Sequence, residues 1–225
     1  MKAQFIRGVS LKELLDPEAM VWRGVKPEPL LLSGTPSALQ PTLAVRAAFP
    51  EGTIGAVKNV VVAGAHNGGE IAFRLEWQDH SADTGADGQD DVGFPDGAAI
   101  LFPTRKGAPL MTMGAPGLPV NAWYWRADEN GRGRHVTAQG LGTSDTLDRE
   151  LVKANGIYQS GVWRVVIARS LQTRNGGSAA QLSAGGKTGI SVAIWEGSHK
   201  ERAGIKSFAL GQQEGWHELI LDRQA

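Results

Sequence analysis

The sequence predicts a mainly β protein, an antiparallel β-sandwich of about ten strands with one or two short helices. Short stretches alternate apolar with polar residues, turns rich in Gly, Asn and Asp separate them, and helical periodicity is nearly absent. Sandwiches of 225 residues commonly form one unit, so we expect a single domain over residues 1–225.

The composition excludes several kinds of partner and site. Basic and acidic residues balance at 23 each, so no global field would attract nucleic acid or an anionic membrane. Cysteine is absent, which excludes disulfides, Cys-ligated zinc, iron–sulfur clusters and thiol catalysis within this chain. We find no apolar run typical of a signal peptide and none long enough to span a membrane.

The first part of the chain is expected to be irregular. Ser10 and Glu13 form a capping-box pattern, but Pro17 limits any helix to a turn or two. Residues 19–22 and 30–32 are short strand candidates. A β-hairpin should follow, because the β-rich residues 57–65 and 71–78 flank an Asn-Gly pair, and alternation in the second strand predicts one buried face.

An acidic, Gly-rich segment runs from Asp79 to Asp96. Carboxylates at such spacing could hold calcium, but the pattern misses that of an EF-hand. A solvated loop is the favoured interpretation. Residues 98–102 then read as a buried strand.

The most distinctive stretch joins a Met-containing loop to an aromatic strand. Two Gly and two Pro lie between Met113 and Val120, and they would hold the thioethers of Met111 and Met113 still at the mouth of a sheet, as a metal ligand requires. Core packing is the commoner role of Met. The aromatic strand covers residues 121–127, and residues 134–140 read as its partner.

The last third of the chain is also rich in strands. Leu147 and Leu151, spaced by four, with Asp148 near the amino end, predict a short helix over residues 146–155. Further strands are expected at residues 162–168, 190–195, 206–210 and 216–221.

Histidines and tryptophans give no site by themselves. No two histidines lie at ligand spacing, so each is expected at the surface or in a turn: His66, His80, His135, His199 and His217. Six tryptophans fall within expected strands, where core packing is the default role: Trp77, Trp123, Trp125, Trp163, Trp195 and Trp216. Nucleotide-binding and hydrolase motifs are absent.

Three segments, in this order, resemble the haem-binding γ subunit of ethylbenzene dehydrogenase and its relatives in the type II DMSO reductase family, which include dimethylsulfide dehydrogenase, chlorate reductase and selenate reductase. They are Ala65-His66-Asn67-Gly68, Thr112-Met113-Gly114-Ala115 with Pro119-Val120-Asn121-Ala122-Trp123-Tyr124-Trp125, and Ala193-Ile194-Trp195-Glu196-Gly197 with Glu201-Arg202-Ala203-Gly204-Ile205-Lys206-Ser207. The second is the most specific.

The resemblance implies one non-covalent haem b at one end of the sandwich, with a methionine sulfur and a lysine amine as axial ligands. Carried over residue by residue, the ligands are Met113 and Lys206. Met111 remains an alternative to Met113, and Lys200 and Lys187 remain alternatives to Lys206. Without the motif, Lys206 would read as an edge-strand lysine that discourages sheet pairing.

Such a ligand pair has chemical consequences. A lysine with a pKa near roughly 10.4 must lose its proton to bind iron, and burial favours that loss. A thioether favours reduced iron and raises the reduction potential. With both axial positions occupied, electron transfer is expected and catalysis at the haem is not.

The resemblance therefore implies a non-catalytic, periplasmic electron-transfer subunit of a molybdenum enzyme. Electrons would pass between a β subunit with iron–sulfur clusters and an external carrier such as a c-type cytochrome, while an α subunit carries the molybdenum cofactor. A partner with a twin-arginine signal would carry the folded chain across the membrane. The alternative is a carbohydrate-binding sandwich, since Trp123 and Trp125 share a strand face and could stack on sugars.

Overall fold

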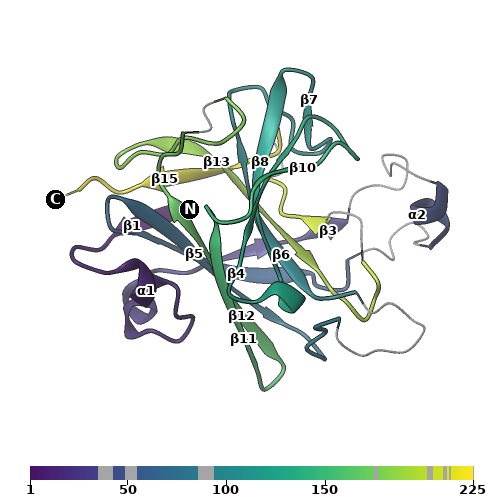
Figure 1. The fold of residues 1–225 in the computed structure, drawn as a ribbon, viewed down its shortest axis with the longest axis horizontal. Helices are drawn as coiled ribbons and strands as arrows, with labels where there is room; N and C mark the ends of the chain where they lie inside the picture. The colour runs from purple at the N-terminus through teal and green to yellow at the C-terminus, as the bar shows by residue number, and fades with distance from the viewer. Residues whose placement is uncertain are drawn as a thin grey trace.

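The computed structural model describes residues 1–34, 43–48, 55–85, 94–174, 177–201, 205–209, 212 and 214–224. Over these residues, fifteen strands form one continuous hydrogen-bonded ladder that folds into two packed layers (Figure 1). The predicted mainly β sandwich is confirmed. The strands outnumber the roughly ten expected because several span only two to four residues.

The first layer contains the predicted hairpin. Its strands are β1 (Lys2–Phe5), β2 (Glu28–Leu31), β4 (Asn59–His66), β5 (Glu70–Gln78), β11 (Lys153–Gln159), β12 (Val162–Ser170) and β15 (His217–Leu221). Strands β4 and β5 pair in antiparallel fashion, and the side-chain oxygen of Asn67 accepts the backbone N–H groups of Gly69 and Glu70 at 2.9 and 2.8 Å. The Asn-Gly hairpin is therefore confirmed.

The second layer carries the aromatic strand. Its strands are β3 (Ser33–Gly34), β6 (Gly97–Pro103), β7 (Gly114–Ala115), β8 (Leu118–Arg126), β9 (Arg134–Ala138), β10 (Asp145–Asp148), β13 (Lys187–Trp195) and β14 (Ile205–Lys206). Strand β13 pairs with β15 through its first residues and with β6 through its last ones. It therefore links the two layers.

The core lies between the layers and is rich in aromatic rings. The indoles of Trp125 and Trp163 meet edge to face with centroids 5.0 Å apart, and Phe102 lies 4.6 Å from Trp123. The core role expected for the tryptophans is confirmed for Trp77, Trp123, Trp125 and Trp163. Trp195 differs, because it is only half-buried and faces the outside of the second layer.

The helices are short. The capping box of Ser10 and Glu13 is confirmed at α1 (Leu11–Leu14). The strand expected at residues 19–22 is wrong: a 3-10 helix, η1 (Met20–Gly24), forms there, and the indole N–H of Trp22 donates to Leu14 and Asp16 carbonyls. These elements cover the outer face of the first layer, and α2 (Leu43–Ala48) lies away from them (Figure 1).

The helix predicted over residues 146–155 is also wrong. Strands β10 and β11 occupy its two ends, and a turn lies between them. The carboxylate of Asp148 accepts the backbone N–H groups of Glu150 and Leu151 at 2.6 and 2.7 Å, which closes this turn. Asp side chains favour such local bonds, and two leucines four residues apart are too weak a pattern to oppose them.

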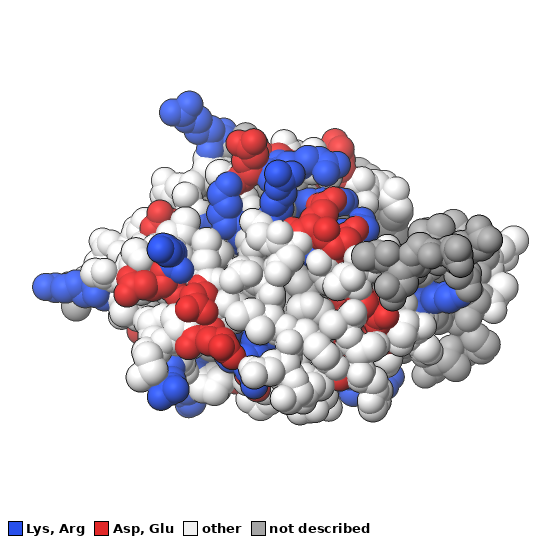
Figure 2. Space-filling view, turned by 60° about the horizontal axis from the view of Figure 1, so that its bottom comes forward, with Lys and Arg blue, Asp and Glu red and all other residues white. Residues whose placement is uncertain are grey.

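The surface offers no large field of one sign on the face in Figure 2, where basic and acidic side chains are interspersed among uncharged ones. This agrees with the balanced composition. Of the helices in the described part of the chain, none has the length and apolar character needed to cross a membrane.

Candidate cofactor pocket

A cavity of about 300 Å³ opens on the outer face of the second layer. One row of its lining consists of successive cross-strand partners, which run from β14 to β9: Lys206, Ala193, Ala99, Tyr124 and Arg134. Direct cross-strand partners project from the same face of a sheet. The register of five strands therefore builds this side of the cavity.

A second row lies beside the first and contains Leu101, Ala122 and Val136. We call Ala99, Leu101, Ala122, Val136 and Ala193 the cavity floor. Three of these five side chains are single methyl groups, so the floor is apolar and its side chains extend only a short way from the sheet. The cavity exists because small residues stand where larger ones would fill the space.

Met113 lies at the edge of the cavity in the left-handed backbone region, with φ of 57°. Its carbonyl accepts the N–H of Gly140 at 3.0 Å. Gly114 follows with φ of 91°, and a Cβ there would come within 2.7 Å of the Leu118 carbonyl oxygen. Glycine is therefore required after Met113. Met111, 44% exposed, does not line the cavity.

Lys206 faces the cavity from β14 and is only 2% exposed. Its amine has no hydrogen-bond partner among the described residues, and burial lowers its pKa to about 8. It is not an edge lysine, because it pairs with Ala193 on one side and Ser33 on the other. The competing Lys200 and Lys187 are exposed and do not line the cavity.

Serine side chains hold Lys206 in place. Of the strand predicted at residues 206–210, the described residues 207–209 are not in a strand, and β14 covers Ile205–Lys206. The hydroxyl of Ser207 instead accepts the Val192 N–H at 3.0 Å. Ser207 in turn donates its backbone N–H to the Val192 carbonyl, and Ser191 donates its hydroxyl to the Ser207 carbonyl.

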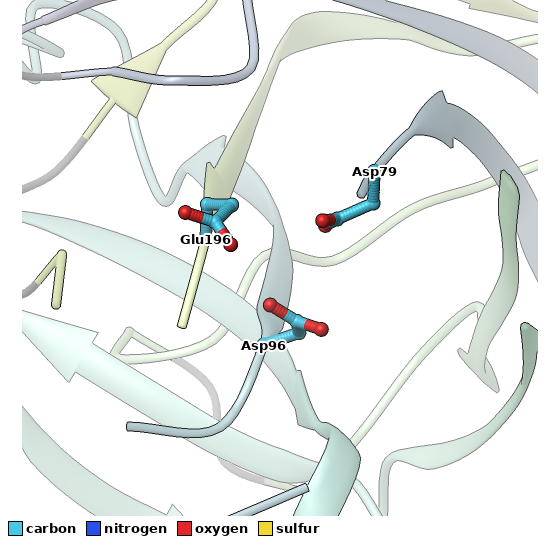
Figure 3. A group of neighbouring side chains, drawn as sticks. All are labelled: Asp79, Asp96 and Glu196. Carbon is cyan, nitrogen blue, oxygen red and sulfur yellow. The ribbon is translucent and has the colours of Figure 1, made fainter. Parts of the chain in front are cut away.

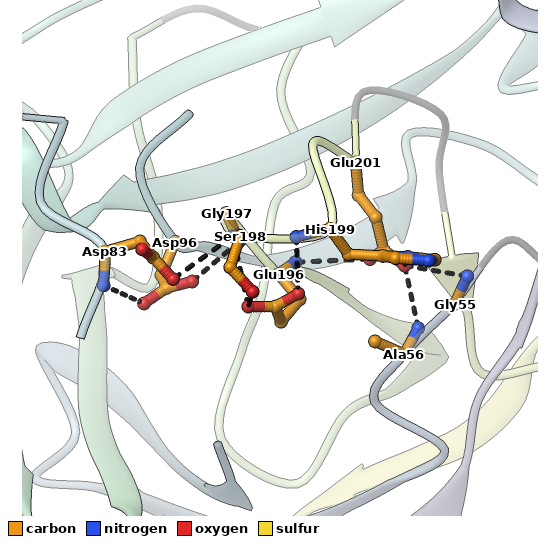
Figure 4. A network of polar contacts seen from close by, with 9 residues as sticks. All are labelled: Gly55, Ala56, Asp83, Asp96, Glu196, Gly197, Ser198, His199 and Glu201. Atoms are coloured by element: carbon orange, nitrogen blue, oxygen red, sulfur yellow. Dashed lines mark hydrogen bonds and ion pairs between the residues drawn. The ribbon is translucent and has the colours of Figure 1, made fainter. Parts of the chain in front are cut away.

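Glu201 fixes the residues that follow β13, as far as Glu201 itself (Figure 4). Its fully buried carboxylate accepts the backbone N–H groups of Gly55, Ala56 and Glu196 at 2.8, 2.7 and 3.1 Å. His199 contacts the same carboxylate through Nδ1 at 3.0 Å. One side chain thus ties the end of β13 to the segment before β4.

Three buried carboxylates, those of Asp79, Asp96 and Glu196, point toward one another (Figure 3). Their ligand-type oxygens lie within 4.8 Å of one another. Burial raises the pKa of Asp96 to about 7. The solvated-loop interpretation is therefore wrong at both ends of the acidic segment. Asp87, Asp90 and Asp91 lie outside the described residues.

Hydrogen bonds account for this carboxylate cluster. Asp96 accepts N–H groups from Asp83, Trp163 and Gly197, at 2.8, 2.9 and 2.8 Å. The carboxylates of Asp79 and Glu196 likewise accept indole, hydroxyl or backbone donors. The cluster therefore joins loops to one another, and we assign no metal to it.

Two histidines were misplaced by the sequence pattern. His80 and His199 are exposed as expected, but His66 and His135 are fully buried. Burial lowers the pKa of His135 to about 4, with a smaller effect from the nearby Arg169. Neither buried ring lines the cavity.

Sequence reasoning also missed aromatic and charged residues that border the cavity. Tyr124 and Trp195 meet edge to face, with ring centroids 5.2 Å apart. Arg134 borders the cavity and forms a two-point ion pair with Glu129. Strict alternation along the aromatic strand, which places Tyr124 on the same face as Ala122, could have identified the first of these.

Comparison with known proteins agrees with this architecture. The chain matches a family described as ethylbenzene dehydrogenase over residues 19–149 and 137–207. ORF7 of Haloferax mediterranei, provisionally named a respiratory nitrate reductase heme subunit, is 29% identical over 214 residues, which cover 91% of this chain and 72% of ORF7. The chlorate reductase subunit gamma of Ideonella dechloratans is 36% identical over 143 residues, 63% of this chain and 58% of that subunit.

Solved structures share the fold at low identity. A Bacteroides uniformis protein, provisionally described as carbohydrate-binding, superposes with a TM-score of 0.59 at 13% identity and covers 99% of this chain and 98% of its own. A family 9 carbohydrate-binding module of Caldicellulosiruptor kristjanssonii, solved with cellotriose, gives 0.53 at 10% identity, with 100% and 95% covered. At such identity the likeness establishes the sandwich fold alone.

Proposed function

Because this chain belongs to the ethylbenzene dehydrogenase family, we propose that it is a haem-binding electron-transfer subunit of an oxidoreductase complex, formed by a single domain over residues 1–225. The observation that carries the proposal is the buried amine of Lys206, which has no partner among the described residues and faces the same cavity as the thioether of Met113. The names of the two relatives, a heme subunit and a reductase γ subunit, support it.

The residues of the cavity fit a haem. Its floor is apolar, as the face of a porphyrin requires, and its volume of about 300 Å³ lies at the lower end of the roughly 300–1,000 Å³ typical of small-molecule sites. One thioether and one amine are available as ligands, and with no cysteine in the chain any haem must be held without thioether bonds to its vinyl groups. A non-covalent haem b is therefore the form we propose.

Burial prepares Lys206 to bind iron. Its amine must be uncharged to donate a lone pair. Because its pKa of about 8 is only about one unit above pH 7, removing the proton at pH 7 costs about 1.4 kcal/mol. An exposed lysine would need a far larger change. The buried position thus lowers the cost of forming the lysine–iron bond.

The ligand pair favours electron transfer. A bound haem iron supplies one-electron oxidation and reduction. Because Met113 and Lys206 would together occupy both axial positions, they would keep substrate away from the metal. The soft sulfur of Met113 would favour the reduced state.

We extend the proposal to the partners and the location of the oxidoreductase complex. The partners would be an α subunit with a molybdenum cofactor, a β subunit with iron–sulfur clusters and an external carrier such as a c-type cytochrome. The location would be the periplasm, reached together with a partner that carries a twin-arginine signal. The name of the reductase γ-subunit relative supports the existence of partner subunits.

The carbohydrate-binding alternative loses its basis. Trp123 and Trp125, which would have stacked on sugars, are fully buried between the layers. The carbohydrate-binding fold neighbours share the architecture at only 10–13% identity.

A haem assay tests the proposal. The protein is purified from cells supplied with haem, and its pyridine haemochrome spectrum and haem-to-protein ratio are measured. We expect one b-type haem per chain, released by acid acetone, and we expect the double variant Met113→Ala, Lys206→Ala to retain far less. A colourless wild-type protein would refute the proposal.

A further inference from the structure

Arg169 is a cation buried between the two layers without a counter-charge. It lies near the end of β12, and 1% of its surface is exposed. No carboxylate among the described residues forms an ion pair with it. Its pKa, although lowered by burial, stays at about 10, so the guanidinium is charged at neutral pH.

All of its hydrogen-bond partners are neutral. Nη1 lies 3.4 Å from the side-chain oxygen of Asn121 and 3.3 Å from Nε2 of His135, and the guanidinium carbon lies 4.5 Å above the ring of Trp123. Nε2 of His135 also lies 3.2 Å from the side-chain oxygen of Asn121, so it accepts from Arg169 in one tautomer and donates to Asn121 in the other, and the ring is neutral in both. The remaining donors reach the carbonyl oxygens of Ser170, Leu171 and Ala180 at 2.9, 3.2 and 2.6 Å.

This charge lies directly behind the cavity floor. Ala122 and Val136 are cross-strand partners that face the cavity. Their chain neighbours Asn121 and His135 face the opposite side of the same strands and contact Arg169. Successive residues of a strand alternate between faces, so a single sheet separates the guanidinium from the cavity.

The other charged groups at the cavity do not supply an equivalent field. Arg134 is paired with the carboxylate of Glu129, and Asp145 is exposed to solvent. Lys206 would be neutral when it binds iron. Among the described residues that line the cavity or lie directly behind its floor, Arg169 is therefore the one that carries an unpaired positive charge.

We propose that Arg169 raises the reduction potential of the haem in this cavity by stabilising its reduced state electrostatically. The inference rests on the proposed function. Ferrous haem carries one positive charge fewer than ferric haem, so a nearby fixed cation favours the ferrous form. Inside the core the effective dielectric constant is low and mobile ions are excluded, so this field is weakly screened.

Redox titration of the haem-loaded protein tests the role of Arg169. Arg169→Gln removes the charge, and we expect its midpoint potential to shift to lower values while the low-spin spectrum persists. Arg169→Lys keeps a cation and should restore most of the potential. Arg164→Gln is the matched control on β12, because Arg164 pairs with Glu76 on the outer side and should leave the potential unchanged.

A second variant guards against failure of Arg169→Gln to fold. Asn121→Asp is nearly isosteric and places a carboxylate beside the guanidinium, so the charge is cancelled while Arg169 remains. We again expect a lower potential, at low and high salt alike. The inference alone would be overturned if the haem-loaded protein kept its midpoint potential in both Arg169→Gln and Asn121→Asp. It would also be overturned if Arg169→Lys lowered the potential as much as Arg169→Gln. A wild-type protein without haem would overturn the proposed function and this inference with it.

Discussion

Ala193 and Lys206 are direct cross-strand partners, so a single methyl group stands beside the long lysine side chain on the face that borders the cavity. A larger residue at position 193 would occupy the space in front of the amine. The pairing thus lets a lysine that is only 2% exposed keep its nitrogen available to a ligand.

The first prediction separates the two methionines near the cavity. Met113→Ala should weaken haem retention at least about tenfold, or about 1.4 kcal/mol, and lower the potential, because the sulfur ligand is lost. Met111→Ala is the control and should change neither, since Met111 does not line the cavity. Haem transfer to apomyoglobin measures retention. If Met111→Ala had the larger effect, the sulfur would be misassigned.

The second prediction concerns the cavity floor. Ala122→Leu should fill part of the cavity and reduce haem binding at least about tenfold while changing the free energy of unfolding by less than about 1.5 kcal/mol, because the added atoms enter existing space. Ala115→Leu, near Met113 but outside the lining, serves as the control. Titration with hemin and urea unfolding provide the measurements. Normal haem binding by Ala122→Leu would place the haem elsewhere.

The third prediction uses the pKa of Lys206 in the haem-free protein. It is about 8 in the fold and 10.5 without burial, so between these values the unfolded chain binds more protons. The destabilisation by the buried amine is complete below about pH 8 and disappears as the pH rises to 10.5. Lys206→Met should therefore be more stable at pH 7 by about 3 kcal/mol, and the difference should shrink toward pH 10.

Urea midpoints of the two haem-free proteins at several pH values test this, because other titrating groups cancel in the difference. A difference that stays constant with pH would mean that Lys206 is solvated in the absence of haem.

The fourth prediction addresses Glu201. Glu201→Ala should destabilise the fold by about 3 kcal/mol, because two buried backbone N–H groups and a part-buried one lose their acceptor. It should also raise the high-spin fraction of the ferric haem, since the end of β13, the strand that pairs with Lys206, loosens. Glu218→Ala, at an exposed ion pair with Lys187, should do neither. A destabilised variant with an unchanged spectrum would limit Glu201 to a structural role.

The sequence predicted most strands because their side chains alternate or are uniformly apolar, as in β5 and β13. It failed where a single polar side chain decides the local structure. Asp148 closes a turn in place of the expected helix, and the Ser207 hydroxyl replaces a strand hydrogen bond. The Asp148 bonds are local, and the spacing of two leucines was wrongly given more weight than these bonds. The Ser207 bond reaches Val192, 15 residues away in the sequence, which a local pattern does not contain.

For the site, the motif indicated Met113 and Lys206, and both line one cavity. The sequence did not reveal what surrounds them. A buried Arg169 looks like any strand-end arginine until the opposite layer places Asn121 and His135 against it. The expected strand ended at residue 168, one residue too early to assign Arg169 to the inner face.

The pairing of β1 with β15 also bears on how the protein is made. These strands lie side by side in parallel, and they join β4 of one layer to β13 of the other. During synthesis the two layers cannot be hydrogen-bonded into one ladder until residues 217–221 have emerged from the ribosome. Contacts so distant in sequence slow folding. Until β15 is in place, the open edges of β1 and β13 are sites where nascent chains can aggregate, so a chaperone that covers them should raise the yield.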